Sequence, residues 1–549
     1  MRNRALILVA AISLWTAMSF SGIVLADASR PRVSPTATPT VSRPRISVTT
    51  PTPLGTPSQG KVAPAETPVP TSTPTLLDLQ SGIRQKLLNP AVNRSRVGVK
   101  IVSLATGKVV YEQDAEKYFT PASNMKNFTV ATAFERLGPN FRFVTSVYAT
   151  APVDPSGTIK GDLRILGRGD VSMSTSFATK PTSDPEIYYE RMDRLADAIV
   201  ASGVKLVEGS LVADESYFTG HAVPVTWEWD DIGWYDGAEV SAFPLNNNAM
   251  DLKVRGTSNG QPCAVTISPP TPLYVINNQC TTGGSQRAIV VDKALEKNTL
   301  TVSGTIPAGT EWTGSPTFTH PADLFVAMLK ERLEKKGVIV TGTTRTLAAG
   351  VKPTEQIEIT RLESPPFSEV AAKTMKPSQN MYTETILWTL GEQIGRKSGG
   401  TGISATLGVN VVKSFMQQAG IPLDSVVQYD GSGMSRHDVV TPGAIVQLYT
   451  YMAKQSPNAL AWRASLAVGG IDGTLRNRFK GTAASENFRG KTGTLDQVSA
   501  LSGYVTTRSG EQLVLSIIVN NMPSTGSGPR TAIIDSIVLD LANYTGRID

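Results

Sequence analysis

Three short patterns of serine, lysine, asparagine and threonine could together perform nucleophilic chemistry. Ser123 and Lys126 are three residues apart at the predicted start of a helix, where side chains at this spacing are neighbours. The unpaired N–H groups of a helix start are positively polarised, and a lysine held among buried neutral groups can act as a base. Two other Ser-x-x-Lys matches begin at Ser58, in a Pro/Thr-rich segment, and at Ser202, across a helix end. Context therefore singles out Ser123 as the candidate nucleophile and Lys126 as its base, but this stretch alone favours a helix cap beside a surface lysine.

The second and third patterns follow later in the chain. Ser378-Gln379-Asn380 opens another predicted helix, and Lys491-Thr492-Gly493 is the single Lys-Thr-Gly of the sequence. Taken alone, the first could be a helix cap and the second a strand with a glycine bulge. Gly493 would let a backbone approach a substrate closely, and Thr494 adds an N–H and a hydroxyl. The order Ser-x-x-Lys, Ser-x-Asn, Lys-Thr-Gly predicts that the three patterns form one active site.

Composition excludes several other kinds of protein. The 549 residues carry a formal charge of +6, and subtracting the +5 of residues 1–76 leaves +1 for the remainder. A near-neutral globule has no electrostatic footprint for nucleic acid. Three histidines, without metal-ligand spacing, predict neither a metal site nor a Ser-His-Asp mechanism, and no cofactor is expected. Cys263 and Cys280 are seventeen positions apart and could form a disulfide outside the cytoplasm or remain two buried thiols.

The N-terminal part has the composition of an export signal and a tether. Residues 1–26 combine a short basic head, a long uncharged apolar run and small residues before a cleavage point after Ala26. An uncleaved membrane anchor is the alternative, because the apolar run is long. Residues 27–75 are rich in Pro, Thr and Ser and predict a disordered tether. We therefore expect an exported protein of the periplasm or cell envelope, with membrane or wall association through this segment.

The remaining chain predicts an α+β fold with a large insertion. A hairpin near residues 97–113 and strand-like segments near 487–521 are expected to form one antiparallel sheet covered by helices. Residues 76–142 and 351–549 would form this catalytic domain, and residues 143–350 an inserted α+β region. Within the insertion, residues 188–211 and 324–344 both read helix, Gly-Val, strand and glycine, which indicates a weak internal duplication.

The ordered patterns and several longer phrases resemble one family. "GSLVADESYF", "YDGSGMSRHDVVTP" and "GGIDGTLRNRF" accompany the three patterns, and the similarity extends over residues 77–549. The chain resembles the D-alanyl-D-alanine carboxypeptidase/endopeptidase family of low-molecular-mass penicillin-binding proteins. The resemblance implies a penicillin-binding-protein/β-lactamase-like transpeptidase domain and a serine hydrolase that acts on peptidoglycan stem peptides. Gln379 departs from the wider superfamily, where an acid is common at this position.

By this resemblance, five residues carry the reaction. Ser123 attacks the carbonyl between two D-alanines and Lys126 takes its proton. Ser378 and Lys491 complete the proton route to the leaving amine, and Asn380 orients Lys126 and the substrate amide. Water then hydrolyses the acyl-enzyme, and β-lactam antibiotics would be covalent inhibitors trapped at the same step.

The resemblance also implies substrate contacts. The backbone N–H groups of the nucleophile and of Thr494 would form the oxyanion hole, and the Lys-Thr-Gly lysine with Thr492 and Thr494 would bind the terminal carboxylate beside Gly493. Arg436 would line the pocket for the stem-peptide side chain, and Asp214 would meet the amino end of a diamino acid. The structural alternatives are a surface arginine beside a turn and a turn-capping aspartate.

Two rival functions use the same scaffold. A β-lactamase would share the acylation step but release the drug quickly, and the large insertion with its tether argues against it. A non-catalytic wall-binding or β-lactam-sensing protein is disfavoured by the intact patterns. Carboxypeptidase, endopeptidase and transpeptidase activities are not distinguished by the sequence.

Overall fold

A computed structural model describes residues 73–90, 92–347, 356–523 and 528–548. The predicted signal, residues 1–26, and all but the last residues of the predicted tether lie outside these ranges. Residues 71–549 form one compact unit. Within the described ranges, none of the helices combines the length and apolar character that crossing a bilayer requires.

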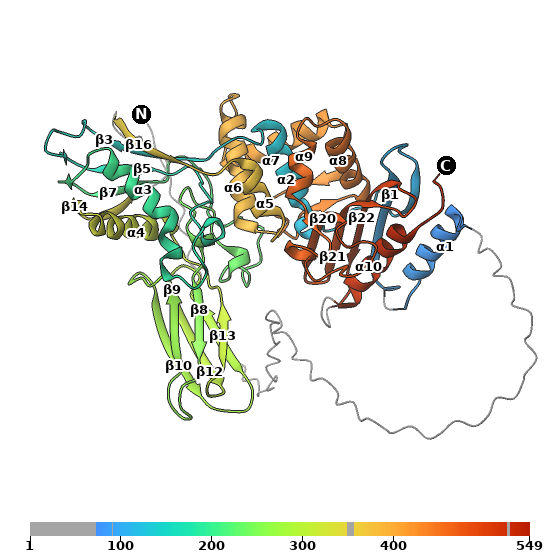
Figure 1. The fold of residues 1–549 in the computed structure, drawn as a ribbon, viewed down its shortest axis with the longest axis horizontal. Coiled ribbons are helices and arrows are strands. Elements are labelled where there is room, and N and C mark those ends of the chain that lie inside the picture. The colour runs from blue at the N-terminus through green and yellow to red at the C-terminus, as the bar shows by residue number, and fades with distance from the viewer. Residues whose placement is uncertain (1–72, 91, 348–355, 524–527, 549) are drawn as a thin grey trace, which may run out of the picture. The chain divides into compact units, whose positions relative to one another are not determined.

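A six-stranded antiparallel sheet joins the two ends of this unit. The strand order is β19-β20-β21-β22-β1-β2, so the N-terminal hairpin completes a sheet made mainly by the C-terminal strands. The blue β1 lies beside the red β22 in Figure 1, with Val97 opposite Val519. This confirms the predicted sheet. Its strands are β1 (Arg96–Ser103), β2 (Val109–Gln113), β19 (Ala467–Val468), β20 (Arg489–Leu495), β21 (Val498–Thr506) and β22 (Gln512–Asn520).

Both faces of the sheet are buried, which explains its nearly continuous apolar strands. Successive side chains of a strand point to opposite faces. Leu515 and Ile517 of β22 pack in the core beneath α1 and α10, whereas Val514 and Ile518 pack in the core shared with α2 and α8. The helices of this domain are α1 (Leu76–Leu87), α2 (Lys126–Arg136), α5 (Phe367–Met375), α6 (Asn380–Leu390), α7 (Ser404–Gln418), α8 (Pro442–Lys454), α9 (Ala459–Ser465) and α10 (Gly528–Asn543).

Close packing of α6 on α7 fixes the helix that bears the Ser-x-Asn pattern. A Cβ on Gly408 would lie 2.1 Å from the carbonyl oxygen of Leu387, and one on Gly391 would lie 2.1 Å from that of Ser404. Only glycine permits this approach. The π-helical turn η6 (Gly391–Arg396) continues α6, and the short hairpin of β17 (Val426–Val427) and β18 (Val439–Val440) follows α7.

The inserted region contains the two predicted repeats side by side. Strands β6 and β7 after α3 pair in parallel with β14 and β15 after α4, and β4 and β5 form a third such pair. Three glycines stack where the three pairs turn, namely Gly161, Gly209 and Gly342. Their approach is so close that a Cβ on Gly209 would lie 2.4 Å from the carbonyl carbon of Gly161. The elements are α3 (Glu190–Ala201), α4 (Pro321–Lys335), β4 (Thr158–Ile159), β5 (Leu163–Leu166), β6 (Leu206–Val207), β7 (Leu211–Asp214), β14 (Ile339–Val340) and β15 (Thr344–Leu347).

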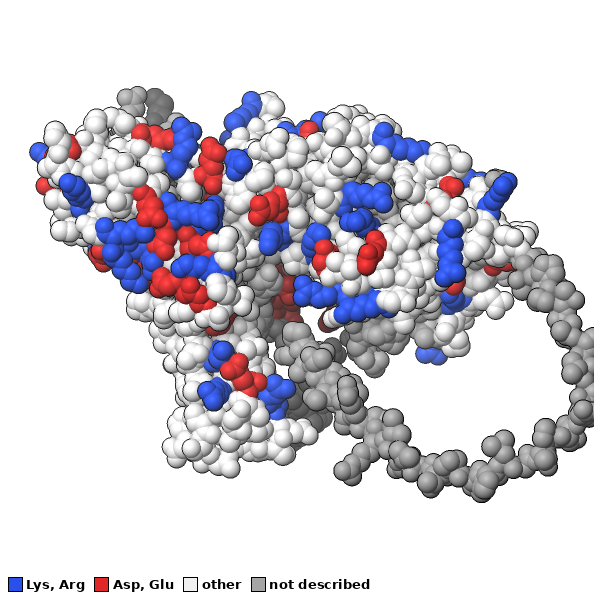
Figure 2. All heavy atoms as spheres, viewed as in Figure 1, with Lys and Arg blue, Asp and Glu red and all other residues white. Residues whose placement is uncertain are grey.

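The sheet of the inserted region extends past the predicted boundary. Strand β3 (Val144–Ala149) pairs with β16 (Ile357–Glu363), which lies after residue 350. On the face seen in Figure 2, basic and acidic side chains are interspersed. In the interior of this region, the buried Arg332 of α4 contacts both Asp193, at 2.7 Å, and Glu186, at 2.8 Å.

A smaller lobe of the insertion consists of two three-stranded sheets. Their orders are β13-β8-β9 and β10-β12-β11. Cys263 and Cys280 form a disulfide with a Cα–Cα distance of 5.4 Å, so the structure contains the pair that the sequence left open. The strands are β8 (Asp251–Arg255), β9 (Ala264–Ser268), β10 (Val275–Thr282), β11 (Ala288–Lys293), β12 (Thr299–Ile306) and β13 (Glu311–Gly314).

Candidate active site

The Ser-x-x-Lys serine lies in a tight turn that precedes the α-helix. Ser123 belongs to the 3₁₀ turn η1 (Ala122–Met125), and Lys126 is the first residue of α2. Ala122 has a positive φ of 48°, and a Cβ on Gly433 would lie only 1.9 Å from the Ala122 carbonyl oxygen. Such left-handed backbone at a non-glycine residue is costly and occurs often at functional sites. The turn leaves Ser123 partly exposed and directs Lys126 into the interior.

Lys126 is fully buried and holds the nucleophile directly. Its Nζ lies 3.0 Å from Ser123 Oγ, 2.5 Å from Asn380 Oδ1 and 2.8 Å from the carbonyl oxygen of Ser432. Burial lowers the pKa of Lys126 to about 8, although the nearby carboxylates of Asp430 and Glu384 oppose this shift. Lys126 therefore has the geometry and the proton affinity of a general base for Ser123.

A second serine–lysine pair lies next to the first. Lys491 Nζ donates to Ser378 Oγ at 2.7 Å and to the carbonyl oxygen of Thr492 at 2.9 Å. Burial, and the nearby charge of Lys126, hold the pKa of Lys491 well below its ordinary value. The site thus contains two hydroxyl groups, each hydrogen-bonded to a lysine that deprotonates easily.

The Ser-x-Asn pattern divides its tasks among its three residues. The Gln379 side chain, not Ser378, caps α6 by accepting from the backbone N–H of Tyr382 at 3.0 Å. Ser378 has a positive φ of 69°, and its hydroxyl remains available to Lys491. Asn380 accepts from Lys126 and donates from Nδ2 to the Asp236 carbonyl oxygen at 3.0 Å. Asn380 therefore links the catalytic lysine to the inserted region.

The Lys-Thr-Gly strand lies beside the nucleophile turn. A Cβ on Gly493 would be 2.6 Å from the carbonyl oxygen of Pro121 and 2.9 Å from Asn124 Nδ2. The glycine therefore allows β20 to approach the nucleophile turn, whereas the sequence suggested an approach to substrate. Thr492 Oγ1 donates to Thr474 Oγ1 at 2.7 Å, and Thr494 is exposed.

The two weaker assignments separate in the structure. Arg436 donates from Nη1 to the carbonyl oxygen of Asp496 at 2.8 Å, and its guanidinium lies 3.3 Å from Glu228 of the insertion. It therefore lies next to the end of β20, where a substrate contact is feasible. Asp214 is fully buried in β7 and forms an ion pair with Arg164. This placement does not support the predicted contact between Asp214 and substrate, because the carboxylate has no exposed surface and already has a cationic partner.

Other groups of the site were absent from the sequence-based prediction. The Ser432 carbonyl and the Asp236 carbonyl are backbone acceptors, and no residue type marks such a role. Glu384 is a single acid one helical turn after Asn380, and this spacing on α6 was the available signal for it.

This arrangement defines a class of enzyme. A partly exposed serine, a buried lysine of lowered proton affinity and a second lysine–serine pair at a sheet edge are the parts of a serine acyl-transfer enzyme of the penicillin-binding-protein class. The lysine replaces the histidine of the more familiar triads.

Comparison with known proteins supports this class and gives the family. Residues 79–544 match the family model of the D-Ala-D-Ala carboxypeptidase 3 (S13) family, and the chain belongs to this family. A D-alanyl-D-alanine carboxypeptidase of Actinomadura sp. is 33% identical over 489 residues, which cover 86% of each chain. The D-alanyl-D-alanine carboxypeptidase DacB of Haemophilus influenzae is 24% identical over 465 residues, covering 83% of this chain and 91% of that protein.

The fold has a counterpart among solved structures. The crystal structure of penicillin binding protein 4 (dacB) from Haemophilus influenzae matches with a TM-score of 0.71 at 22% identity, over 84% of this chain and 99% of that one. The same protein complexed with a β-lactam matches with a TM-score of 0.66 at 21% identity, over 84% and 99% of the two chains. The predicted family, fold class and serine carboxypeptidase activity are thus confirmed.

Proposed function

We propose that the chain removes the terminal D-alanine of peptidoglycan stem peptides through an acyl-enzyme on Ser123. The observation that carries this proposal is the pair of serine–lysine contacts, 3.0 Å for Ser123 with Lys126 and 2.7 Å for Ser378 with Lys491. Both lysines are fully buried, which lowers their pKa values and so raises the fraction of each that is neutral near neutral pH. A neutral lysine can accept the proton that a serine must lose to become a nucleophile.

In the acylation step, Lys126 accepts the Ser123 hydroxyl proton as Oγ attacks the carbonyl carbon of the scissile D-alanyl-D-alanine bond. The carbonyl oxygen becomes an oxyanion facing the backbone N–H groups of Ser123 and Thr494, and each such donor is worth about 3 kcal/mol in other enzymes. The C–N bond then breaks. The leaving amine receives a proton through the Ser378 hydroxyl, which Lys491 replenishes.

In the deacylation step, water attacks the ester carbon of the acyl-enzyme, and the proton that it loses passes through the Ser378 hydroxyl back to Lys491. The ester C–O bond breaks, and Ser123 recovers its proton from Lys126. The products are the shortened stem peptide and a free enzyme in its starting protonation state. Asn380 and the Ser432 carbonyl keep Lys126 in place through both steps, because each contacts its Nζ within 2.8 Å.

Recognition of the substrate carboxylate is assigned to the end of β20. Lys491 supplies a nearby positive potential when protonated, and the Thr492 and Thr494 hydroxyls are hydrogen-bond donors beside it. Arg436 lies next to Asp496, two residues beyond Thr494, and supports a pocket for the stem-peptide side chain there.

Cross-linked peptides and β-lactams are the further ligands of this site. A D-alanyl cross-link contains the same type of amide, so an endopeptidase activity would use the same steps. A β-lactam presents a reactive amide and would acylate Ser123. The relative's complex with a β-lactam supports this inhibitor class. Because peptidoglycan lies outside the cytoplasm, the proposal includes export through residues 1–26, with residues 27–75 as a tether.

Product analysis tests the proposal. Purified chain is incubated with uncross-linked and cross-linked muropeptides, with Ser123→Ala as the control. Release of D-alanine from the uncross-linked pentapeptide, absent in Ser123→Ala, is expected. Rapid steady-state hydrolysis of a chromogenic cephalosporin without release of D-alanine would identify a β-lactamase instead. Sequencing of the mature N-terminus tests the proposed cleavage after Ala26.

A further inference from the structure

Glu384 is a buried acid that the reaction described above does not use. It lies on α6 four residues after Asn380, so both side chains extend from one face of the helix. Its side chain is 1% exposed. The carboxylate accepts from the backbone N–H of Gly431, at 3.0 and 2.9 Å to its two oxygens, and from that of Ser432 at 2.7 Å.

These contacts continue to the catalytic lysine. The N–H of Ser432 is bound by Glu384, and the carbonyl of the same residue accepts from Lys126 Nζ at 2.8 Å. The Ser432 carbonyl shares its planar peptide unit with the N–H of Gly433, whereas Glu384 holds the preceding unit and so fixes the position from which that carbonyl extends. Helix α6 therefore holds Lys126 twice, directly through Asn380 and indirectly through Glu384 and the backbone of Gly431 and Ser432.

We propose that Glu384 is a positioning residue for the general base, which fixes the Gly431–Ser432 peptide unit, places the Ser432 carbonyl within reach of Lys126 and so keeps Nζ beside Ser123 Oγ. Asp430 has a complementary role in the same loop. It accepts from the backbone N–H groups of Gly433, at 2.6 Å, and Ser435, at 2.8 Å, and the Gly433 contact orients the peptide unit that contains the Ser432 carbonyl. The inference rests on the proposed acylation of Ser123.

An acid is needed here because the loop presents donors that only an acceptor group can satisfy. Two buried N–H groups converge on Glu384, and leaving both unpaired would be costly. One carboxylate oxygen, Oε1, accepts from both N–H groups, and the other accepts from Gly431 alone. A glutamine that keeps its oxygen in the Oε1 position would place its NH₂ 2.9 Å from the Gly431 nitrogen, donor against donor. Glu384→Gln should therefore push Gly431 away from α6 and loosen the loop that carries the Ser432 carbonyl.

The charges around the lysine give a second readout. Asp430, Glu384, Asp236 and Asp438 all raise the pKa of Lys126 against the effect of burial, and Lys491 is the cation beside it. Burial and the charge of Asp430 raise the pKa of Glu384 itself to about 8. Glu384 therefore carries its charge toward the alkaline part of the range, and its removal should move the upper part of the rising limb of the acylation rate to lower pH, an effect that general loss of packing would not produce.

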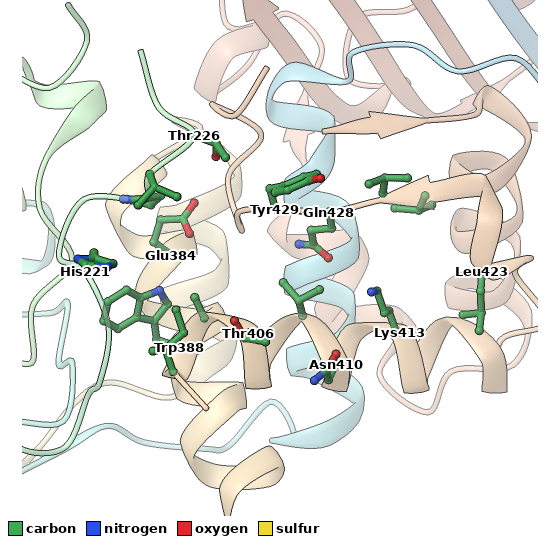
Figure 3. Close-up of a pocket in the computed structure, with 17 residues that line it drawn as sticks. His221, Thr226, Glu384, Trp388, Thr406, Asn410, Lys413, Leu423, Gln428 and Tyr429 are labelled. Atoms are coloured by element: carbon green, nitrogen blue, oxygen red, sulfur yellow. The ribbon is translucent and has the colours of Figure 1, made fainter. Parts of the chain in front are cut away.

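The opposite side of Glu384 borders a cavity. This cavity has a volume of about 520 Å³ and lies between α6, α7 and residues of the insertion, including His221 and Thr226. Figure 3 shows Glu384 and Trp388 on one side of it and Gln428 and Tyr429 on another. The cavity offers a small carboxylate a route to the Glu384 position when the side chain is truncated.

The test compares Glu384→Gln and Glu384→Ala with the full wild-type chain. Acylation by a fluorescent penicillin is measured as a second-order rate constant from pH 6 to pH 10, and thermal melting establishes that each variant is folded. Glu392→Gln is the matched control, because Glu392 is a buried acid on the continuing helix that contacts Arg396 and Ser404. A loss of about tenfold or more is expected for both Glu384 variants, with the limb of Glu384→Gln at lower pH and the control unchanged. Formate should partly restore acylation of Glu384→Ala.

Three outcomes would overturn the inference. They are a wild-type rate with an unshifted limb in folded Glu384→Gln, an equal loss in Glu392→Gln, and a crystal structure of Glu384→Gln with Lys126 Nζ still within hydrogen-bond distance of Ser123 Oγ and the Ser432 carbonyl. The crystal structure needs no activity. Absence of any adduct in the wild-type chain would instead contradict the proposed acylation of Ser123.

Discussion

The lowered proton affinity of Lys126 predicts a particular dependence of acylation on pH. Lys126 must be neutral to accept the Ser123 proton, so the acylation rate constant should follow its deprotonated fraction. With its pKa lowered by burial to about 8, this fraction is about 9% at pH 7 and about 91% at pH 9, a rise of about tenfold. A lysine at the ordinary value of 10.5 would rise about a hundredfold over the same interval.

Stopped-flow measurements with a fluorescent penicillin can distinguish these two slopes. The rate constant is measured from pH 6 to pH 10, and intact-mass spectrometry verifies a single adduct on Ser123. Lys126→Arg is the control that retains the charge but cannot supply a neutral base, and a loss of about 10²- to 10⁴-fold is expected for it. Lys491→Gln tests which lysine causes the rise of the acylation rate constant with pH. This rise should persist in that variant.

Two pH profiles would refute this reasoning. One is a rise of about a hundredfold between pH 7 and pH 9, which would mean that burial does not lower the pKa of Lys126. The other is a limb that disappears in Lys491→Gln, which would transfer the role of base to the second lysine. A folded Lys126→Arg variant that still acylates at the wild-type rate would exclude Lys126 as the base altogether.

Four further predictions follow from close packing and from the disulfide. Gly493→Ala should slow acylation by about 10²-fold in a muropeptide or penicillin assay, because the added Cβ would lie 2.6 Å from the Pro121 carbonyl oxygen and push the nucleophile turn away from β20. Gly209→Ala should lower the free energy of unfolding by about 1–3 kcal/mol in denaturant titrations, because its Cβ would meet backbone at 2.4 Å. Gly82→Ala in α1 should instead raise the free energy of unfolding by about 0.5–1 kcal/mol, because the added Cβ would have no neighbouring atom within 4 Å outside its own helix backbone. Cys263→Ser should destabilise the chain by about 3 kcal/mol by opening the loop closed with Cys280, and an equal melting temperature with and without the disulfide would contradict this.

Local patterns predicted the parts of the site whose chemistry depends on residue type. Ser123, Lys126, Ser378, Asn380 and Lys491 were found because each belongs to a short pattern at a helix start or in a strand, and the structure brings all five together. The antiparallel sheet was also predictable, since its strands are apolar runs bounded by turns.

The missing parts depend on contacts between distant segments. The Ser432 carbonyl acts through its backbone, and Lys126, its donor, is 306 residues away. Asp214 was predicted to contact substrate, and a sequence does not show that Arg164, 50 residues earlier on an adjacent strand, is its ion-pair partner. Gln379 caps α6 in the structure, whereas a capping role was the alternative considered for Ser378. Tertiary pairing decided each of these cases.

The pairing of β1 with β22 has a consequence for folding during synthesis of the protein. Val97 pairs with Val519, so the central sheet cannot close until the chain has been synthesised through β22. Long-range pairing of this kind is slow to form, because the loop must be closed before its contacts stabilise it. Ser123 is synthesised long before Lys491, although the two lie in one site. Asn124, next to Ser123, contacts the Lys491 carbonyl across 367 residues. A chain that stops before β20 can contain the nucleophile and its base and still lack the surface on which a substrate is held, so catalysis begins only after β20, β21 and β22 have been synthesised.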